Sequence, residues 1–192
     1  MWSAISNLGD AALTIPLAIV CFVWLTRSPT GARVAISWAA LLSAAMLLVG
    51  VTKILYAGCG IQIRSLDFRM ISGHTMLASA IWPMSWLIVL NDGSRIKPGA
   101  AIGPGIVFAT AIGISRVFDE AHTVSEVVSG WSLGMLVTIL LIRWNGAPIV
   151  PPRLRPIAAA SLFAVSAVAY GHHAPIQGAI DMYSPWLCEH WA

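Results

Sequence analysis

The stretch from Gly113 to Trp131 reads GISRVFDEAHTVSEVVSGW and places charged side chains between two apolar runs. Only 10% of the 192 residues are Asp, Glu, Lys or Arg, yet Arg116, His122 and three carboxylates gather here. Residues four apart share a face of a helix, so Glu126 reaches His122 if a helix begins near Ala121. A carboxylate bonded to one ring nitrogen fixes the imidazole tautomer and leaves the other nitrogen a good nucleophile or base.

The apolar runs on either side belong to a strongly hydrophobic chain. Hydrophobic residues make up 58% of it, nine residues are Trp, and the mean hydropathy is +0.80. This composition excludes an ordinary water-soluble domain. A helix that crosses a bilayer needs about 17–25 mainly apolar residues. Six runs are candidates for such spans: 11–26, 34–52, 74–90, 99–114, 124–142 and 156–170.

These runs predict helices, because they are continuous where the strands of a membrane barrel would alternate. Residues 1–10 carry no Lys or Arg, so we expect the first run to be a retained helix and not a cleaved signal peptide. The fold expected for residues 1–192 is one all-α domain, a polytopic membrane protein built as a bundle of six transmembrane helices.

The basic residues of the predicted loops indicate an orientation. One membrane face would carry seven of them: Arg27, Arg33, Arg95, Lys97, Arg143, Arg153 and Arg155. The opposite face would carry four: Lys53, Arg64, Arg69 and Arg116. Because basic loops stay on the cytoplasmic side, we expect a multi-pass protein of a bacterial-type inner membrane, with both termini and the loops near 53–73 and 115–123 on the periplasmic face. Topology then accounts for most of the net charge of +3, and no nucleic-acid partner is expected.

A second polar stretch lies between the second and third predicted spans. It includes Lys53 and the turn-like Ser72-Gly73-His74, which stands where a helix begins. Transfer of a phosphoryl group requires fixed cations and N–H groups directed at its oxygens. Lys53 and Arg116 are the candidate cations, and the helix start at Ser72-Gly73 would supply N–H groups. One histidine can then attack phosphorus while the other protonates the departing oxygen.

The two polar stretches resemble motifs of the type 2 phosphatidic acid phosphatase (PAP2) superfamily, which shares its core with vanadium haloperoxidases. That family is recognised by three motifs, of the forms K-x6-RP, PSGH and SR-x5-H-x3-D, on a six-helix membrane core. Here the second appears as Ile71-Ser72-Gly73-His74, and the third as Ser115-Arg116, five residues, His122, three residues and Glu126. The resemblance covers roughly residues 50–130, and the helix count extends it to the whole chain.

The resemblance implies a role for each matching residue. His122 is expected to be the nucleophile that forms a phosphohistidine, Glu126 its orienting partner, and His74 the general acid that protonates the leaving group. The resemblance implies that Arg116, Ser72 and Gly73 hold the phosphoryl oxygens, and Lys53 is expected to join them as the cation of the physical argument above. The mechanism implies no metal and no other cofactor.

The chain departs from the family pattern at two places. Glu126 stands where Asp is usual, and its longer side chain keeps the carboxylate acceptor. Seven residues after Lys53, where the family has Arg-Pro, this chain has Gly60 followed by Ile. We favour Arg69 as the replacement cation, with Arg64 as the rival. A site with fewer cations, or a relative without activity, is left open.

Structural interpretations of the same residues are also open. The histidine and carboxylate pair would suit a cluster that caps a helix, and the lone basic residues would suit side chains that snorkel to the interface. His74, His122 and Glu126 have the side-chain types of a zinc site, although the neighbouring basic residues would repel the ion.

After the last predicted span, residues 171–192 are expected to fold back onto the outer membrane surface. This segment has aromatic residues of the kind found at membrane interfaces: Tyr183, Trp186 and Trp191. In one interpretation His172 and His173 line the substrate entrance. In the other they belong to an ordinary loop.

The three cysteines fall in different environments. Cys21 lies within the first apolar run, while Cys59 and Cys188 fall on the predicted outer face. An oxidising periplasm favours disulfides, so we predict that Cys59 and Cys188 pair and tie the tail to the loop that follows the second span.

The function expected is that of an integral-membrane phosphatase acting on a lipid phosphate or pyrophosphate, with the bilayer as its other partner. Such a substrate keeps its apolar tails in the bilayer while the headgroup enters a site at the membrane surface. The sequence chooses neither the lipid nor an oligomeric state. One alternative is a lipid phosphotransferase that uses the same residues. Another is a non-enzymatic binding or transport protein, although a transporter would have charged or broken helices near the bilayer midplane.

Overall fold

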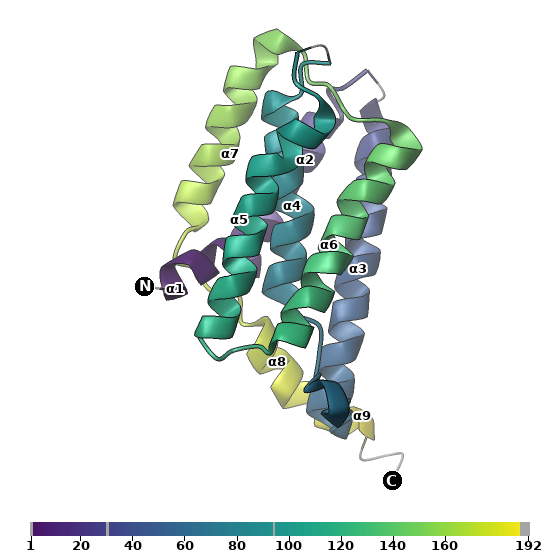
Figure 1. Ribbon diagram of the computed structural model, residues 1–192, viewed down its shortest axis with the longest axis vertical. Helices are drawn as coiled ribbons and strands as arrows, with labels where there is room; N and C mark the ends of the chain where they lie inside the picture. Colours follow the sequence, from purple (N-terminus) through teal and green to yellow (C-terminus); the bar gives the residue numbers. More distant parts are fainter. Residues whose placement is uncertain (1, 30, 94, 189–192) are drawn as a thin grey trace.

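Nine α-helices and three short 3-10 helices follow one another in the computed structural model, which describes residues 2–29, 31–93 and 95–188 (Figure 1). The longer helices are α2 (Ala11–Leu25), α3 (Gly31–Cys59), α4 (Gly73–Leu90), α5 (Pro98–Phe118), α6 (Val124–Asn145) and α7 (Arg155–Ala169). The shorter elements are α1 (Trp2–Ser6), η1 (Asn7–Gly9), η2 (Arg64–Leu66), η3 (Pro152–Leu154), α8 (Ile176–Tyr183) and α9 (Pro185–Cys188). For positions 187 and 188 the description covers the backbone alone.

The six longer helices overlap the six apolar runs of the sequence, and the prediction of an all-α membrane protein is confirmed. Four of them, α3, α4, α5 and α6, are long and apolar enough to cross a membrane. A fifth span is present if Trp2–Gly9 and Ala11–Leu25, which meet at 43°, form one bent segment. Helix α7 has 15 residues, fewer than the about 17–25 that a span needs. The count of six spans therefore stays a prediction.

Helix α4 lies at the centre of the bundle and contacts α2, α3, α5, α6 and α7 (Figure 1). In its most apolar stretch of 18 residues, 67% of the residues are buried, against 33–39% in the corresponding stretches of α3, α5 and α6. Large apolar side chains also point away from the core, since Leu47, Val107 and Phe163 are 70%, 68% and 76% exposed. Apolar surface of this kind suits contact with lipid. The central helix is thus the one that carries the Ser72-Gly73-His74 motif at its start.

Helix α6 approaches α4 closely because two of its residues have no side chain. A Cβ added at Gly130 would lie 2.5 Å from the carbonyl oxygen of Ser72, and one added at Gly134 would meet the carbonyl oxygen of Met76. Small residues let the backbones of membrane helices come together in this way. The contact brings the first turn of α6, with Glu126, beside the first turn of α4.

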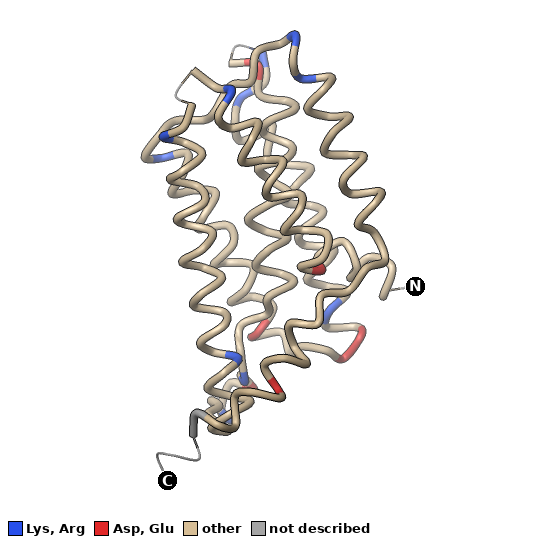
Figure 2. The backbone as a smooth tube through the Cα atoms, turned by 180° about the vertical axis from the view of Figure 1, so that it is seen from behind, with Lys and Arg blue, Asp and Glu red and all other residues tan. Residues whose placement is uncertain are grey.

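The two groups of loops lie at opposite ends of the bundle. Figure 2 shows that Lys and Arg predominate at the end where α2–α3, α4–α5 and α6–α7 are connected, whereas acidic and basic residues are more evenly mixed towards the other end. This arrangement agrees with the grouping of loops expected from the sequence. The orientation of the bundle in a membrane stays a prediction.

The C-terminal segment turns back so that α8 and α9 both contact α3 (Figure 1). Met182, Tyr183 and Trp186 are 66–72% exposed there, and the predicted position of the tail on the membrane surface stays a prediction. Cys59 is disulfide-bonded. The side chain of Cys188 and the whole of Trp191 lie outside the described residues, so the predicted Cys59–Cys188 pair also stays a prediction.

We expect Gly134→Ala to destabilise the bundle, because the added Cβ meets backbone of α4 that cannot move alone. Overpacking of this kind costs about 1–3 kcal/mol. The matched control is Gly103→Ala in α5, where nothing lies within 4 Å of the added Cβ. In detergent, the melting temperature should fall for Gly134→Ala and hold or rise for Gly103→Ala. Equal melting temperatures would contradict the close contact of α4 and α6.

Candidate active site

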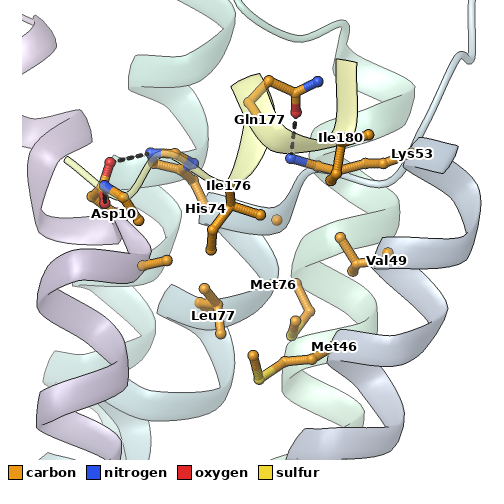
Figure 3. Close-up of a pocket in the computed structure, with 14 residues that line it drawn as sticks. Asp10, Met46, Val49, Lys53, His74, Met76, Leu77, Ile176, Gln177 and Ile180 are labelled. Carbon is orange, nitrogen blue, oxygen red and sulfur yellow. Dashed lines mark hydrogen bonds and ion pairs between the residues drawn. The ribbon is translucent and has the colours of Figure 1, made fainter. Parts of the chain in front are cut away.

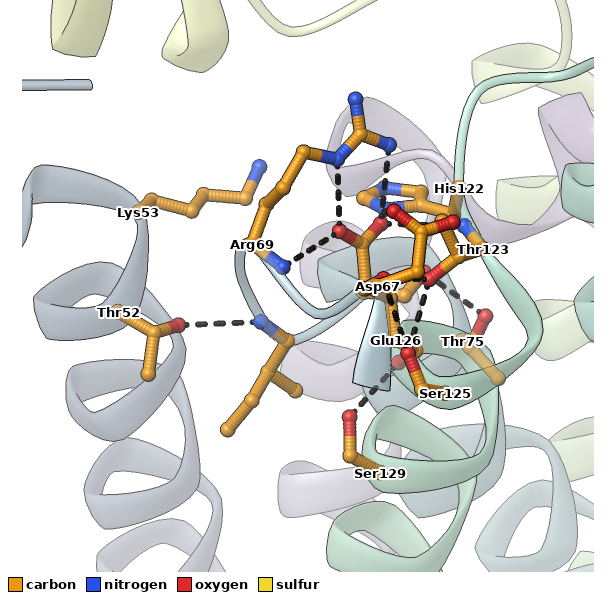
Figure 4. A network of polar contacts seen from close by, with 12 residues as sticks. Thr52, Lys53, Asp67, Arg69, Thr75, His122, Thr123, Ser125, Glu126 and Ser129 are labelled. Atoms are coloured by element: carbon orange, nitrogen blue, oxygen red, sulfur yellow. Dashed lines mark hydrogen bonds and ion pairs between the residues drawn. The ribbon is translucent and has the colours of Figure 1, made fainter. Parts of the chain in front are cut away.

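The carboxylate of Glu126 lies within a network of polar contacts at the start of α6 (Figure 4). The residue is fully buried. Its Oε1 accepts hydrogen bonds from the backbone N–H of Arg69 at 3.0 Å and from Arg69 Nε at 2.9 Å. Its Oε2 accepts the backbone N–H of Thr123 at 3.2 Å and lies 2.7 Å from Nδ1 of His122. These partners offset the cost of removing a charge from water, which is high for an unpaired carboxylate.

The local sequence explains why Glu126 stands there. Thr123 is the N-cap residue of α6 and Glu126 is its third helical residue, and together they form a capping box. Thr123 also donates from Oγ1 to the carbonyl oxygen of Asp67 at 2.7 Å, which ties the preceding loop to α6. The sequence Thr-Val-Ser-Glu from Thr123 to Glu126 is the signature of such a box, so the capping role of Glu126 was predictable from the sequence. The third motif by itself predicts only the contact of Glu126 with His122.

His122 precedes α6 and faces Glu126 as the four-residue spacing predicts. Its side chain is 9% exposed, and its Nδ1 is taken by the carboxylate, which leaves Nε2 for other contacts. Burial lowers the pKa of His122 below its ordinary value of 6.5, and the charges of Arg116 and Lys53 lower it further, while Glu126 opposes the shift. The imidazole is therefore mainly neutral at pH 7, with a lone pair free on one nitrogen.

Arg69, the favoured replacement for the missing cation, is placed beside Glu126. Its Nη2 lies 3.4 Å from Oε2, in addition to the contacts of its N–H and Nε, and the hydrogen bond to Glu126 raises the pKa of Arg69. The guanidinium is thus committed to the carboxylate, although its side chain is 34% exposed. Arg64 is exposed on η2. A role for either arginine in holding phosphate stays a prediction.

The first turn of α4 carries the second motif. Ser72 is its buried N-cap residue, whose N–H donates to the carbonyl oxygen of Glu126 at 3.1 Å and whose hydroxyl pairs with Thr75 at 2.9 Å. The N–H group and the hydroxyl of Ser72 therefore have protein partners, and the role of Ser72 towards phosphate stays a prediction. Gly73 is open to a cavity, and a Cβ added to it would lie 3.8 Å from Nζ of Lys53.

Two further cations lie near the histidines. Lys53 of α3 donates from Nζ to Oε1 of Gln177 at 2.8 Å. Arg116 of α5 donates from Nη1 to Oγ of Ser6 at 2.8 Å. The Nε of Arg116 is buried and has no hydrogen-bond partner among the described residues. Both charges act on both imidazoles. Because a buried donor without an acceptor is costly, an anion placed here would stabilise the site.

A cavity of about 140 Å³ opens beside His74, among α2, α3, α4 and α8 (Figure 3). Its polar lining includes Asp10, Lys53, His74 and Gln177. Its apolar lining includes Met46, Val49, Met76, Leu77, Ile176 and Ile180. His122 and Arg116 do not line this cavity, but they interact electrostatically with His74, which does. The structure thus brings both histidines and two cations to one end of the bundle.

Three residues of this region are absent from the motifs. Asp10 stands just before an apolar run, which is the sequence signal of an N-cap residue, and it caps α2 as that signal predicts. Ser6 and Gln177 reach the site through tertiary contacts and have no local signal. The zinc alternative finds no support, since in the described part of the chain no three His, Cys, Asp or Glu side chains are grouped to hold a metal ion.

We expect Glu126→Gln to lower the melting temperature. An amide offers one acceptor oxygen where the carboxylate offers two, so Arg69 or His122 would face an N–H group. The loss of a buried hydrogen-bond partner costs about 1–3 kcal/mol. Glu120→Gln is the matched control, since Glu120 is exposed in the loop that precedes α6. If thermal unfolding in detergent gave both variants the same melting temperature, the buried network would not have the importance assigned to it.

We also expect His122 to titrate below its ordinary pKa of 6.5, because burial favours the neutral ring. NMR of protein with labelled histidine rings measures this, and His122→Ala assigns the signal. In Glu126→Gln the midpoint should fall further, because the carboxylate raises the pKa of His122. A midpoint above 6.5 in the wild-type protein would instead mean that the carboxylate outweighs burial.

Comparison with known proteins identifies the family. The family model described as "PAP2 superfamily" matches residues 52–149. A protein of Klebsiella pneumoniae described as "Uncharacterized 22.5 kDa protein in cps region" is 33% identical over 142 residues, which cover 73% of this chain and 68% of that protein. Phosphatidylglycerophosphatase B of Bacillus subtilis (strain 168) is 36% identical over 78 residues, which cover 39% of this chain and 38% of that protein.

A similar match reaches a second named phosphatase. Glucose-6-phosphatase 3 of Mus musculus is 34% identical over 85 residues, which cover 42% of this chain and 23% of that protein. The matched part therefore spans less than half of either named phosphatase, and no solved structure matches the chain significantly. These relatives support a phosphatase-type function. The family match and the Klebsiella relative extend over enough of the sequence to show that this chain belongs to the PAP2 superfamily.

Proposed function

We propose that the protein is an integral-membrane phosphatase that hydrolyses a lipid phosphate or pyrophosphate through a phosphohistidine at His122, on the outer face of the membrane. The observation that carries the proposal is the placing of His74 and His122 beside the cations Lys53 and Arg116, in a PAP2 chain made of apolar helices. Hydrolysis of this kind needs a nucleophile, a proton donor and fixed positive charge.

The hydrogen-bond donors of the site suit a phosphoryl group. The buried Nε of Arg116 lacks a partner among the described residues, and the ammonium of Lys53 faces the start of α4 at Gly73. Phosphate oxygens would accept from these donors, and the N-terminus of a helix adds a favourable dipole. Arg116, Lys53 and Gly73 are the proposed phosphate ligands. Arg69 acts through Glu126 in this scheme.

In the first step, Nε2 of His122 attacks phosphorus. A P–N bond forms as the P–O bond to the leaving group breaks, and Glu126 stabilises the positive charge that develops on the ring through Nδ1. His74 gives its proton to the leaving oxygen, which departs as the alcohol of the lipid or as a phosphate. The positive charges of Lys53 and Arg116 stabilise the charge on the phosphoryl oxygens in the transition state.

In the second step, water attacks the phosphohistidine. His74, now neutral, takes a proton from this water as the P–N bond breaks. Inorganic phosphate leaves, and His122 regains its lone pair while His74 regains its proton. General acid–base catalysis of this kind contributes about 10²–10⁴-fold to a rate.

The lining of the cavity supports a lipid as the substrate. Polar groups stand near His74, and the apolar lining continues into a second hollow of about 210 Å³ among α2, α3 and α4. The two hollows share Met46 and Leu77. An amphiphile with its phosphate at His74 would keep its tails along this apolar path, and apolar walls with a few polar groups are typical of small-molecule sites.

The charge distribution supports the proposed orientation. The basic loops lie at the end of the bundle away from the histidines (Figure 2), and loops rich in Lys and Arg stay on the cytoplasmic side. The site would then open on the periplasmic face of an inner membrane, where the phosphate of an outer-leaflet lipid can reach it.

Phosphate release from a panel of detergent-solubilised lipid phosphates and pyrophosphates tests the function. The wild-type protein should release phosphate from at least one of them, and His122→Ala should reduce kcat by about 10³-fold or more, as removal of a nucleophile does. The variant is compared only after its melting temperature and its elution volume are shown to match those of the wild type.

A radiolabelled substrate tests the intermediate. Label trapped by rapid quenching in alkali should remain on the wild-type protein and be lost in acid, as expected of a phosphohistidine, and His122→Ala should carry none. Release that survives in His122→Ala would contradict the assigned nucleophile. If the folded wild-type protein released no phosphate, with or without an acceptor lipid, the proposed phosphatase function would be wrong.

A further inference from the structure

Asp10 stands where η1 ends and α2 begins, and its carboxylate is directed at the candidate site (Figure 3). The residue is 6% exposed. Its Oδ1 accepts the backbone N–H groups of Ala12 at 2.8 Å and Ala174 at 3.0 Å. Its Oδ2 lies 3.4 Å from Nε2 of His74 and 3.3 Å from Nδ1 of His173. One oxygen thus caps α2 and binds the C-terminal segment, while the other faces two imidazoles.

The contact places a carboxylate beside each of the two candidate catalytic histidines, although Asp10 shares its Oδ2 with His173. Glu126 lies at Nδ1 of His122, and Asp10 lies at Nε2 of His74. Glu126 belongs to the third motif, whereas Asp10 lies more than 60 residues before His74 in the sequence and outside all three motifs. Asp10 reaches His74 because the chain just before α2 packs closely against the start of α4. A Cβ added at Gly9 would lie 3.1 Å from the carbonyl oxygen of His74.

The charges around His74 explain what this carboxylate does. Burial is the largest effect that disfavours a charge on this ring, and the fixed cations Arg116 and Lys53 add to it, as does His122 when it is protonated. A ring that must carry a proton, and so a positive charge, is destabilised by such neighbours. Asp10 is the negative group that acts on the same ring, and an opposite charge at this distance favours the protonated imidazole.

We propose that Asp10 is a positioning residue for proton transfer, whose Oδ2 orients His74 through Nε2 and stabilises its imidazolium form. The inference rests on the proposed phosphatase function and deepens it. With Nε2–H held by Asp10, the proton on Nδ1 of His74 passes to the leaving oxygen as its bond to phosphorus breaks, and the ring is left neutral. In the second step, Nδ1 takes a proton from the attacking water, and Asp10 again stabilises the imidazolium that results.

A merely structural Asp10 would behave differently from a positioning one. Its Oδ1 contacts cap α2 and hold residue 174, so their loss would disturb the site for every substrate alike. A group that assists proton donation instead affects substrates according to their leaving group. An alkoxide leaves poorly without a proton, whereas nitrophenolate is a stable anion that leaves without one.

The experiment compares two substrates in the same detergent micelles: a lipid phosphate monoester that the wild-type protein hydrolyses, and 4-nitrophenyl phosphate. Asp10→Asn keeps an oxygen to cap α2 but removes the charge. It should lower kcat/KM for the lipid, which reports the reaction up to release of the leaving group, by about 10–100-fold, at or below the lower end of the range of about 10²–10⁴-fold for general acid catalysis. For 4-nitrophenyl phosphate the loss in kcat/KM should stay below about threefold, because its leaving group departs without a proton from a general acid. Asp10→Glu restores the charge and should recover part of the activity on the lipid.

Two controls separate charge from folding. Asp92→Asn makes the same substitution at the far end of the bundle, where Oδ1 of Asp92 also caps backbone N–H groups, at 2.7 Å and 3.0 Å, and it should leave both activities unchanged. If Asp10→Asn does not give folded protein, Asp10→Ser replaces it, because serine is a good N-cap residue without charge. In a His74→Ala background, the Asp10 substitution should cause little further loss.

The outcomes are distinguishable. Equal losses of kcat/KM on both substrates, or losses that add to those of His74→Ala, would overturn the positioning role and leave the phosphatase function intact. Unchanged hydrolysis of the lipid by folded Asp10→Asn would overturn it as well. If the wild-type protein released phosphate from no lipid, the proposed function would fail, and this inference would fail with it.

Discussion

The buried carboxylate of Glu126 is the constraint on which the candidate site depends. A charge removed from water costs several kcal/mol unless hydrogen bonds replace its hydration, and here they come from segments far apart in sequence. Arg69 belongs to the loop before α4, while His122 and Thr123 belong to the loop before α6. Each of these groups must stay in place for the charge to stay satisfied. The carboxylate therefore holds the two loops together and orients the imidazole at the same time.

The packing of α6 against α4 also holds the two loops and their histidines in place. Gly130 allows the backbone of α6 to approach Ser72, and Ser72 in turn donates its N–H to the carbonyl oxygen of Glu126 at 3.1 Å. The first turns of α4 and α6 are thus bonded to each other, so His74 and His122 keep a constant relation. For a reaction in which one ring attacks and the other moves a proton, constant geometry is worth more than any single contact. Small residues within the helices supply it, at positions that no catalytic motif includes.

Patterns within a single segment predicted much of this structure, and contacts between segments account for what was not predicted. Continuous apolar runs gave the positions of the longer helices, and the four-residue spacing gave the contact of His122 with Glu126. The position of Arg69 could not be predicted in this way, because its binding to Glu126 depends on how the loop before α4 folds over α6. Asp10 carries a local signal for a helix N-cap, but its contact with His74 exists only because α2 and α4 begin side by side. The number of spans depends on the bilayer as well as on the chain, so hydropathy alone does not decide whether α7, with 15 residues, crosses the membrane.

The contact of Lys53 with Gln177 suggests a way in which the proposed site would accept an anion. The ammonium is bonded to a neutral amide oxygen of α8 at 2.8 Å, which keeps the charge satisfied and brings α8 over the cavity. A phosphoryl oxygen carries a negative charge that the amide oxygen lacks, so it would attract the ammonium more strongly and displace the amide. Gln177 would keep its second contact, from Nε2 to Oδ1 of Asp181 at 2.8 Å. The C-terminal segment would therefore cover the proposed site and still release Lys53 to a ligand, because its hydrogen bond to Lys53 is weaker than the ion pair that would replace it.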